Sequence, residues 1–284
     1  MEKIAVVTDT GSNLSFAQAK ELGIYLLPLQ ITIDETTYQD TLEISTQDIY
    51  NELANGKMPK TSMAAYQKIY DLFEELKKDY DTIFAVPLTN GLSTNASTMQ
   101  SIARELEMNV HVIDMYATCA LEKHVAIWIK KLVDEHKSSE EILKIIQPAI
   151  DESNSLILVK NLQHLKRGGR LTPMAAALAG LLKIYPVLHI NKSTEGRIDV
   201  LNKVRTEKRA DAYAIDKIMD DIDIQHTYIY IIHSNFLEGA NHFKKCFIEK
   251  GVPEQNIHID YISSVIAVHT GLGCIAIQYI REEN

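Results

Sequence analysis

Short apolar runs alternate with amphipathic stretches along the first half of the chain. The apolar runs are rich in β-branched residues and predict buried strands at residues 3–8, 24–29, 82–86 and 110–113. The amphipathic stretches predict helices at residues 16–22, 46–53, 64–78 and 96–106. Residues 30–38 alternate between apolar and polar positions and predict a hairpin that turns at Asp34 and Glu35. Strands that alternate with helices in this way are typical of a mainly parallel sheet with helices on both faces.

The second half of the chain has a different pattern. Apolar runs predict strands at residues 155–159, 187–191, 197–201, 226–232, 256–261 and 274–280. Helical patterns fall at residues 173–183, 207–222 and 235–249. The strands at 187–191 and 197–201 flank a turn at Glu195 and Gly196, which predicts a hairpin. We therefore expect two α/β domains, residues 1–153 with a mainly parallel sheet and residues 154–284 with a mixed sheet and helices.

Polar turns follow several of the predicted strands. The run PLTNGLSTNAST, at residues 87–98, connects an apolar strand to a helix without a charged side chain. Further polar turns lie at residues 9–13, 61–62 and 114–119. The carboxyl ends of parallel strands meet at one edge of a sheet, where α/β proteins bind ligands. Hydroxyls, amides and the free N–H groups at the start of a helix bind oxyanions, so this edge is the predicted ligand site.

Composition narrows the classes of partner. The 284 residues carry a formal net charge of −9, which argues against a nucleic-acid-binding surface. The three cysteines are scattered and form neither a disulfide framework nor a metal-spaced pair, as expected in a reducing cytosol. No apolar run is long enough to span a bilayer. We expect a cytoplasmic protein without an integral membrane segment and without a bound metal.

Common motifs for nucleotide binding and hydrolysis are absent from the sequence. It contains no GxGxxG, no Walker A loop, no GxSxG and no HExxH. Asp9 follows the first strand, as in phosphoryl-aspartate sites, but Gly11 stands where such enzymes have a second aspartate. Cys119 has no base paired to it in the sequence pattern. A site rich in hydroxyls and poor in nucleophiles favours holding an anion, and a phosphotransferase or hydrolase that uses Asp9 or His269 is the alternative.

Three polar residues outside the 87–98 run have two interpretations each. Thr61 and Ser62 precede a helical pattern, so they are either caps of that helix or hydroxyls that contact a ligand. His269 lies between an apolar run and a glycine turn, where a histidine is more often a hydrogen-bonded structural residue than a catalyst. The sequence pattern alone leaves both pairs of interpretations open.

Basic residues raise a similar choice. Lys166, Arg167 and Arg170 surround two glycines in the segment HLKRGGRLT. Cations favour the carboxyl ends of helices and glycine often ends them, so the segment is either a capped helix end or a patch that faces an anion or a partner. Arg205 lies in a polar stretch that is typical of surface ion pairs. On a chain with a negative net charge, a local cationic segment is a candidate dock for an acidic partner.

The motifs and their order resemble the DegV family of bacterial fatty-acid-binding proteins. VTDTGSNLS at residues 7–15 is similar to the family's opening motif, and KTS at 60–62 is similar to its threonine–serine motif. PLTNGLSTNAS at 87–97 is similar to the family's serine-rich loop. LQHLKRGGRLT at 162–172 and HTGLG at 269–273 complete a resemblance that covers nearly the whole chain.

The resemblance implies a lipid carrier that is not itself an enzyme. A long-chain fatty acid would lie in an apolar tunnel between two α/β domains, as a ligand and without a cofactor. Thr61 and Ser93 match the residues that bind its carboxylate. The expected head-group neighbourhood is Ser62, Thr94, Asn95, Arg205, His269 and Thr270. In family members that work with a fatty acid kinase, the carrier presents its ligand to an ATP-using subunit, which makes an acyl phosphate for phospholipid synthesis. The local positive charge of Lys166, Arg167 and Arg170 makes these residues our candidates for docking such a partner.

The chain departs from the family pattern near the expected site. Thr94 stands where the family usually has glycine. Met115, Cys119 and Leu121 stand where it tends to have serine or glycine. Because these residues are larger, we expect the tunnel and its loops to differ in shape, which leaves the preferred chain length open.

Overall fold

Four parallel strands form the first sheet of the molecule. The computed structural model describes residues 2–181 and 183–282. In it β1 (Ile4–Asp9), β2 (Tyr25–Leu27), β6 (Thr82–Val86) and β7 (Asn109–Val112) lie side by side in the order β2-β1-β6-β7. Neighbouring strands run parallel, as the strand–helix alternation predicted. The mainly parallel character expected of the first half is therefore confirmed.

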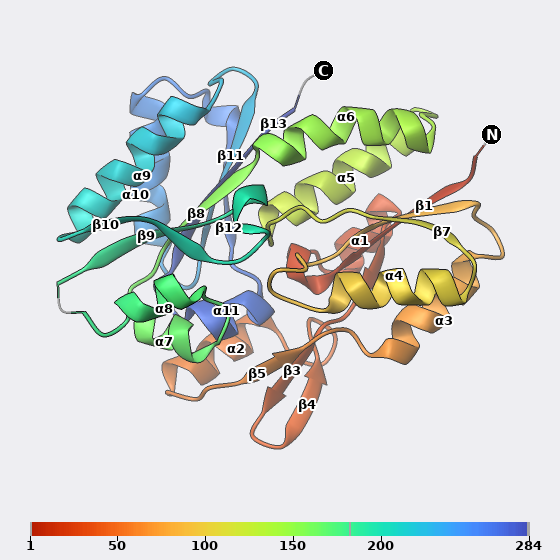
Figure 1. The fold of residues 1–284 in the computed structure, drawn as a ribbon, viewed down its shortest axis with the longest axis horizontal. Coiled ribbons are helices and arrows are strands. Elements are labelled where there is room, and N and C mark those ends of the chain that lie inside the picture. Colours follow the sequence, from red (N-terminus) through yellow and green to blue (C-terminus); the bar gives the residue numbers. More distant parts are fainter. Residues whose placement is uncertain (1, 182, 283–284) are drawn as a thin grey trace.

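Helices cover both faces of this sheet (Figure 1). Successive side chains of a strand point to opposite faces. Val6 and Phe84 point to the face covered by α5 (Ala120–Asp134) and α6 (Ser139–Glu152). The strand residues next to them pack on the other face against α3 (Tyr66–Leu76) and α4 (Asn95–Glu105). The short helix α1 (Phe16–Leu22) connects β1 to β2. Among the described residues, no helix combines the length and the hydrophobicity needed to cross a lipid bilayer.

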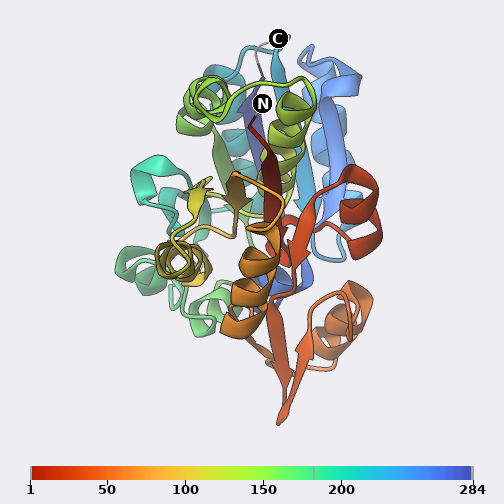
Figure 2. The same cartoon turned by 90° about the vertical axis from the view of Figure 1, so that its right-hand side faces the viewer.

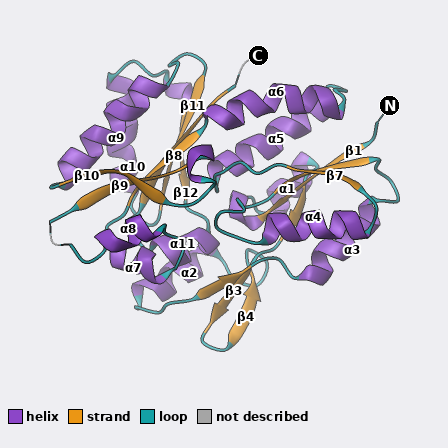
Figure 3. Ribbon diagram, viewed as in Figure 1, coloured by secondary structure: helices purple, strands orange, loops and turns teal. Residues whose placement is uncertain are grey.

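Six strands form a second, mixed sheet. Its strands are β8 (Asn154–Leu158), β9 (Tyr185–Ile190), β10 (Asp199–Val204), β11 (Thr227–His233), β12 (Ile257–Tyr261) and β13 (Ile275–Arg281), in the order β10-β9-β8-β13-β11-β12. Only β11 and β12 pair in parallel within it. The predicted hairpin is present as β9 and β10. Figure 3 shows α9 (Glu207–Asp221) and α10 (Leu237–Glu249) together at one side of this sheet.

The opposite face of the second sheet carries three shorter helices. These are α7 (Leu162–Arg167), α8 (Pro173–Leu178) and α11 (Ser264–Thr270). Leu165, Ala175 and Ala267 join Ile157 and Ile232 of the sheet in one buried apolar cluster. The predicted helix at 173–183 is too long, because α8 ends at Leu178; Leu182 lies outside the described residues. Gly180 follows α8, and glycine is a poor helix former.

A small third sheet places a predicted ligand residue. β3 (Gln30–Ile33) and β4 (Thr36–Gln39) form the expected hairpin, which extends away from the rest of the molecule in Figure 2. β5 (Lys60–Ser62) pairs with β3, so that Thr61 lies opposite Ile31. The prediction that these residues begin a helix is wrong, because β3 offers a strand edge to which they bond; α3 begins only at Tyr66.

The packing crosses the predicted boundary between residues 153 and 154. That boundary lies between α6 and β8. However, α11 comes from the second half of the chain, and its Val265 and Val268 lie in the core formed by α2 (Thr46–Ala54), α3 and the first sheet. The Tyr50 hydroxyl of α2 donates to the Ile262 carbonyl (2.7 Å) in return. The division into two independent domains therefore stays a prediction.

Candidate functional site

Most of the predicted head-group residues meet at a cavity of about 420 Å³ between the small sheet, the 87–98 loop and α11. Its lining includes seven residues singled out from the sequence: Thr61, Ser62, Ser93, Thr94, Arg170, His269 and Thr270. We call it the polar cavity. Leu29, Leu88 and Val265 supply apolar wall. Chain segments more than 200 residues apart thus converge on one place, on the edge at which the first sheet's polar turns lie.

Ser93 is oriented as a hydrogen-bond donor. Its backbone N–H donates to the Thr89 carbonyl (3.1 Å), which closes the turn before α4. The Asn95 backbone N–H donates to the Ser93 Oγ atom (3.2 Å). Because the hydroxyl oxygen already accepts this bond, its proton remains free to point into the cavity. The amino end of α4 adds the positive end of a helix dipole at the same place.

Asp9 fixes both ends of this loop. Its carboxylate accepts hydrogen bonds from the Leu88 backbone N–H (2.9 Å) and from the Asn95 side-chain amide (2.6 Å). A third bond comes from the Gly11 backbone N–H (2.8 Å). Asp9 is completely buried and does not line the polar cavity, so the alternative in which it acts as a nucleophile gains no support. The Asn95 side chain, expected beside the head group, is likewise directed to Asp9 and away from the cavity lining.

Glu122 lies next to Asp9 and was missed in the sequence analysis. It is completely buried and accepts a hydrogen bond from the Thr8 hydroxyl (3.2 Å). Burial, and then the negative charge of Asp9, raise the pKa of Glu122 well above its ordinary value. Burial also raises the pKa of Asp9, although three N–H donors favour its ionised form. We assign the proton of this pair to Glu122. Its place among Val125, Ala126 and Ile129 on the apolar face of α5 is the signal that could have revealed it.

Thr61 and His269 form the central polar contact of the cavity. The Thr61 Oγ1 atom lies 2.7 Å from the His269 Nε2 atom. Burial, and then the charge of Arg170, lower the pKa of His269 to about 4, so the ring is neutral at pH 7 and carries one N–H. If that proton is on Nε2 and is donated to Thr61, the threonine proton is free for a ligand. In that tautomer the cavity offers the hydroxyls of both Thr61 and Ser93 to an anion.

The glycine-rich basic segment supports His269 from behind. α7 ends at Arg167, and Gly168 follows it as the interpretation of a glycine-capped helix end predicted. A Cβ atom on Gly168 would lie 2.9 Å from the His269 Nδ1 atom, so the histidine ring needs a glycine here. The Arg170 guanidinium donates to the Gly168 carbonyl (2.8 Å) and lines the cavity.

The other basic candidates lie elsewhere. Lys166 and Arg167 are exposed on α7, apart from Arg170, which is partly buried. Arg205 is exposed directly after β10 and is not among the residues that line the polar cavity. The docking role of Lys166 and Arg167 and the head-group role of Arg205 stay predictions. Thr94 is exposed at the cavity mouth, and its hydroxyl contacts the Met63 sulfur (3.4 Å).

A narrow apolar cavity continues inward from the polar one. It has a volume of about 30 Å³, and its lining shares Leu92, Ile198, Ile266 and Thr270 with the polar cavity. We call it the inner cavity. It follows the face of the second sheet that carries Ile157, Ile232 and Ala276, and it includes the polar side chains of Thr118, Ser155 and Gln278. The Gln278 amide is satisfied, because it donates to the Thr118 carbonyl (2.9 Å) and the Ser155 hydroxyl (3.0 Å).

The buried residues Met115, Cys119 and Leu121 depart from the family pattern. Met115 and Leu121 lie in the core between the first sheet and α5. Cys119 contacts the Ser263 hydroxyl (3.6 Å). None of the three lines the polar or the inner cavity. Within residues 2–181 and 183–282, no cluster of His, Cys, Asp or Glu is arranged to hold a metal ion.

Comparisons with known proteins agree on one family over the whole chain. A family model described as an uncharacterised protein of the DegV family matches residues 3–282. A DegV domain-containing protein of Halalkalibacterium halodurans is 31% identical over 289 residues, covering 100% of both chains.

Solved structures give the same picture. A protein from Streptococcus agalactiae described as a fatty acid binding DegV family protein has a TM-score of 0.91 and 29% identity, covering 100% of both chains. A protein from Bacillus subtilis described as DegV, a fatty acid binding protein, has a TM-score of 0.86 and 27% identity, covering 99% of this chain and 100% of the other. The two-sheet α/β arrangement is therefore shared with these relatives.

Proposed function

Because this chain belongs to the DegV family, we propose that it binds a long-chain fatty acid, with the carboxylate in the polar cavity and the acyl chain in the inner cavity. The relatives from S. agalactiae and B. subtilis, described as fatty acid binding, support this proposal. The observation that carries it is the continuity of the two cavities. Leu92, Ile198 and Ile266 line both, so a polar head and an apolar tail would each meet matching side chains.

Thr61 and Ser93 are the proposed carboxylate ligands. A carboxylate that leaves water without hydrogen bonds costs several kcal/mol. A hydrogen bond to a charged group contributes about 1.5–3 kcal/mol, so two hydroxyls and the start of α4 can offset that cost. The guanidinium of Arg170 adds a positive charge to the same lining.

The acyl chain supplies most of the proposed affinity. Each buried methylene contributes about 0.8 kcal/mol, which favours a long chain over a short one. The inner cavity of about 30 Å³ is narrow, so an entering chain has to displace partly buried side chains such as Leu92 and Ile266. Leu92 belongs to a loop and Ile266 to a short helix, which are easier to move than the strands of the sheet.

We propose further that the protein presents its fatty acid to an ATP-using kinase subunit and does not itself catalyse the reaction. Ser62 and Thr94 are exposed at the mouth of the polar cavity, so a bound carboxylate would lie near the surface. Arg170 could stabilise the added charge of an acyl phosphate. Arg205 lies outside the cavity, so a role in transfer would require it to reach the phosphoryl group from the surface.

Mass spectrometry of lipid released from the purified, denatured protein tests the binding proposal. We expect one fatty acid per protein molecule, or stoichiometric uptake of added palmitate or oleate. Thr61→Ala and Ser93→Ala should each weaken binding by about tenfold or more. Ser97→Ala is the matched control, because that exposed hydroxyl of α4 donates to the Thr94 carbonyl (2.9 Å) and does not line the polar cavity. Full binding by both site variants would overturn the carboxylate assignment, and a wild-type protein that neither carries nor takes up fatty acid would overturn the function.

A further inference from the structure

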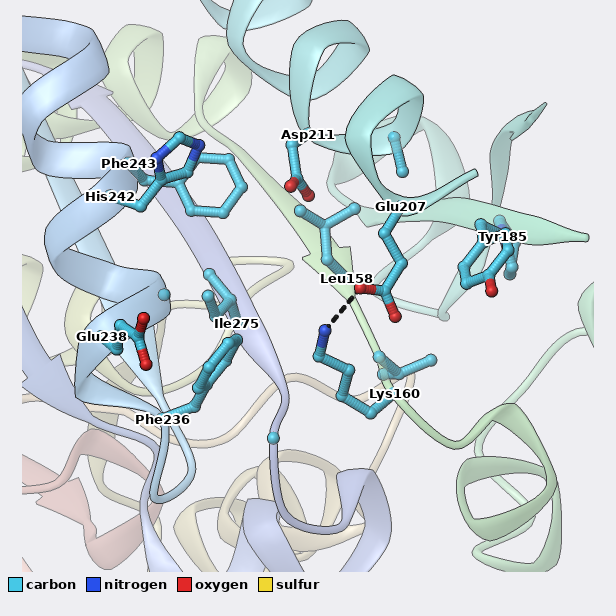
Figure 4. Close-up of a pocket in the computed structure, with 15 residues that line it drawn as sticks. Leu158, Lys160, Tyr185, Glu207, Asp211, Phe236, Glu238, His242, Phe243 and Ile275 are labelled. Carbon is cyan, nitrogen blue, oxygen red and sulfur yellow. Dashed lines mark hydrogen bonds and ion pairs between the residues drawn. The ribbon is translucent and has the colours of Figure 1, made fainter. Parts of the chain in front are cut away.

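Another cavity lies on the second sheet, on the face opposite to the inner cavity. It has a volume of about 350 Å³ and opens between α9 and α10 (Figure 4). We call it the acidic cavity. Leu158 and Ile275 form part of its wall, whereas their neighbours Ile157 and Ala276 line the inner cavity. Because successive strand residues point to opposite faces, the sheet separates the two cavities.

The wall of the acidic cavity is apolar and aromatic. Phe243 of α10 and Phe236, the residue before that helix, face Leu158 and Ile275 of the sheet (Figure 4). Phe243 is buried, whereas Phe236 is only partly buried, so its ring is available to a ligand. The ring of Phe236 already attracts a cation, because the Lys160 Nζ atom lies 5.1 Å from its centroid. Cavities of roughly 300–1,000 Å³ with such walls are typical of small-molecule sites.

Its charges do not balance. Lys160 is paired with Glu207 (2.8 Å), which leaves Asp211 of α9 and Glu238 of α10. Among the described residues, neither carboxylate has a hydrogen bond or an ion pair, but Glu238 is exposed and lies on a different side of the cavity from Asp211 in Figure 4. Asp211 is partly buried and points into the cavity in Figure 4. Burial raises its pKa, whereas the neighbouring His242 and Lys160 act in the opposite direction. A partly buried carboxylate without a partner favours a positively charged ligand.

We propose that the acidic cavity binds a small organic amine, with its ammonium group at Asp211 and its apolar body against Phe236 and Ile275. An ammonium group would supply the hydrogen-bond donors that the Asp211 carboxylate lacks. An aliphatic or aromatic body would cover wall that is otherwise open to water. A carboxylate ligand is excluded by the same charges, so this cavity does not serve as a second fatty acid site.

Three probes of equal shape test the charge requirement. 2-Phenylethylamine, 2-phenylethanol and 3-phenylpropanoate are titrated into the full-length protein, and amide shifts are followed by NMR. We expect the amine to shift residues around Asp211 and in the 236–243 segment, the alcohol to bind at least about tenfold more weakly, and the anion not to bind. Equal binding of amine and alcohol, shifts confined to the polar cavity, or no saturable shift with the amine would each overturn the proposal.

Matched variants test the assigned residues. Asp211→Asn should weaken binding of the amine by about tenfold, because it removes the charge without removing volume, whereas Glu238→Gln should weaken binding less, because Glu238 is exposed and apart from Asp211. Asp220→Asn is the control, since it makes the same change on an exposed part of α9 outside the cavity. Wild-type affinity in Asp211→Asn, with the fold verified by thermal unfolding, would overturn the assignment. Binding of a lysine-containing peptide in place of the free amine would overturn the small-molecule form of the proposal.

The inference is independent of the fatty acid proposal. Asp211→Asn should leave the amount of bound fatty acid unchanged, because the sheet lies between the two sites. Conversely, Thr61→Ala should leave amine binding unchanged. Each proposal can therefore fail while the other stands.

Discussion

The polar cavity and the acidic cavity differ in both chemistry and construction. The polar cavity combines the hydroxyls of Thr61 and Ser93 with the charge of Arg170 and is suited to an anion. The acidic cavity has the partly buried carboxylate of Asp211, which has no ion-pair partner among the described residues, and is suited to a cation. The polar cavity is assembled from both halves of the chain, whereas the acidic cavity is lined by residues between Leu158 and Ile275. An overall charge of −9 predicts neither arrangement.

This difference has a physical basis in the second sheet. Its two faces belong to different layers, with α9 and α10 on one side and α7, α8 and α11 on the other. A charged ligand on one face is separated from the other face by a full layer of apolar side chains. One sheet can therefore contribute to two sites of opposite charge preference. The following changes test how far the two cavities are independent.

The largest effect is expected from Gly91→Ala. Gly91 lies so close to the β9–β10 turn that a Cβ atom would overlap the backbone of Gly196 and come within 2.5 Å of the Glu195 carbonyl oxygen. The loop that carries Ser93 must then move away from the turn. We expect a loss of about 1–3 kcal/mol in the free energy of unfolding and a loss of bound fatty acid, measured by chemical denaturation and mass spectrometry.

Gly180→Ala is the matched control for this change, because no atom of the described residues beyond its two chain neighbours lies within 4 Å of its added Cβ atom. The acidic cavity should still bind 2-phenylethylamine in the Gly91→Ala protein. If fatty acid retention is unchanged in Gly91→Ala, the close contact between the two halves does not shape the polar cavity. If amine binding is lost as well, the two cavities are not independent.

An intermediate effect is expected from His269. His269→Ala removes the hydrogen bond to Thr61 and should weaken fatty acid binding about tenfold, whereas the amide nitrogen of His269→Gln can still donate and should cost less. Equal losses in both variants would show that the ring acts by packing and not by orienting Thr61. Isothermal titration with palmitate measures the difference.

His269 also predicts a pH dependence with a definite sign. Its folded pKa of about 4 is below its ordinary value of 6.5, so the unfolded chain binds more protons between these values. The stability that comes from keeping this histidine neutral is complete above pH 6.5 and is lost as the pH falls toward 4, by at most about 1.4 kcal/mol per pH unit. Asp40, whose pKa burial raises to about 6, acts in the opposite direction.

Comparison with His269→Gln isolates the histidine contribution, because Asp40 is present in both proteins. The difference in unfolding free energy between wild type and variant, measured by urea denaturation at pH 7.5, 6 and 5, should shrink as the pH falls. A difference that stays constant over this range would contradict the lowered pKa. Introducing Asp211→Asn into both proteins should leave this difference unchanged at each pH.

The smallest effect on either cavity is expected from reversing the exposed charges of α7. Lys166→Glu with Arg167→Glu should leave bound fatty acid and amine binding unchanged, because neither side chain lines a cavity. If these residues dock an acidic kinase subunit, transfer of phosphate from ATP to the bound fatty acid should fall strongly in the reconstituted pair. Equal activity of wild type and variant would end the docking hypothesis. Lys208→Glu, an exposed change on α9, is the control.

Local patterns predicted most of the fold. Apolar β-branched runs such as residues 82–86 form strands within one residue of the expectation, because burial on both faces leaves a local signal. The sequence predicts that Lys60–Ser62 begins a helix. This prediction is wrong because the strand conformation of these residues depends on pairing with β3, which lies 30 residues earlier. Short polar edge strands carry no hydrophobic pattern from which to predict them.

The candidate site was predictable only in part. Thr61 and Ser93 were identified by resemblance, and the structure places both at one cavity. The contact between Thr61 and His269 spans 208 residues, so no local pattern could predict it. Arg170 and Arg205 look equally cationic in the sequence, and only the fold shows that the first lines the cavity and the second does not.

The position of α11 has a consequence for how the protein is made. Val265 and Val268 complete the core beneath the first sheet, and His269 completes the polar cavity, yet all three follow β1 by more than 250 positions along the chain. The first half of the chain therefore cannot close its core until α11 has been synthesised. Until then part of the apolar surface around Leu29 stays uncovered, and the long sequence separation of this contact favours slow folding.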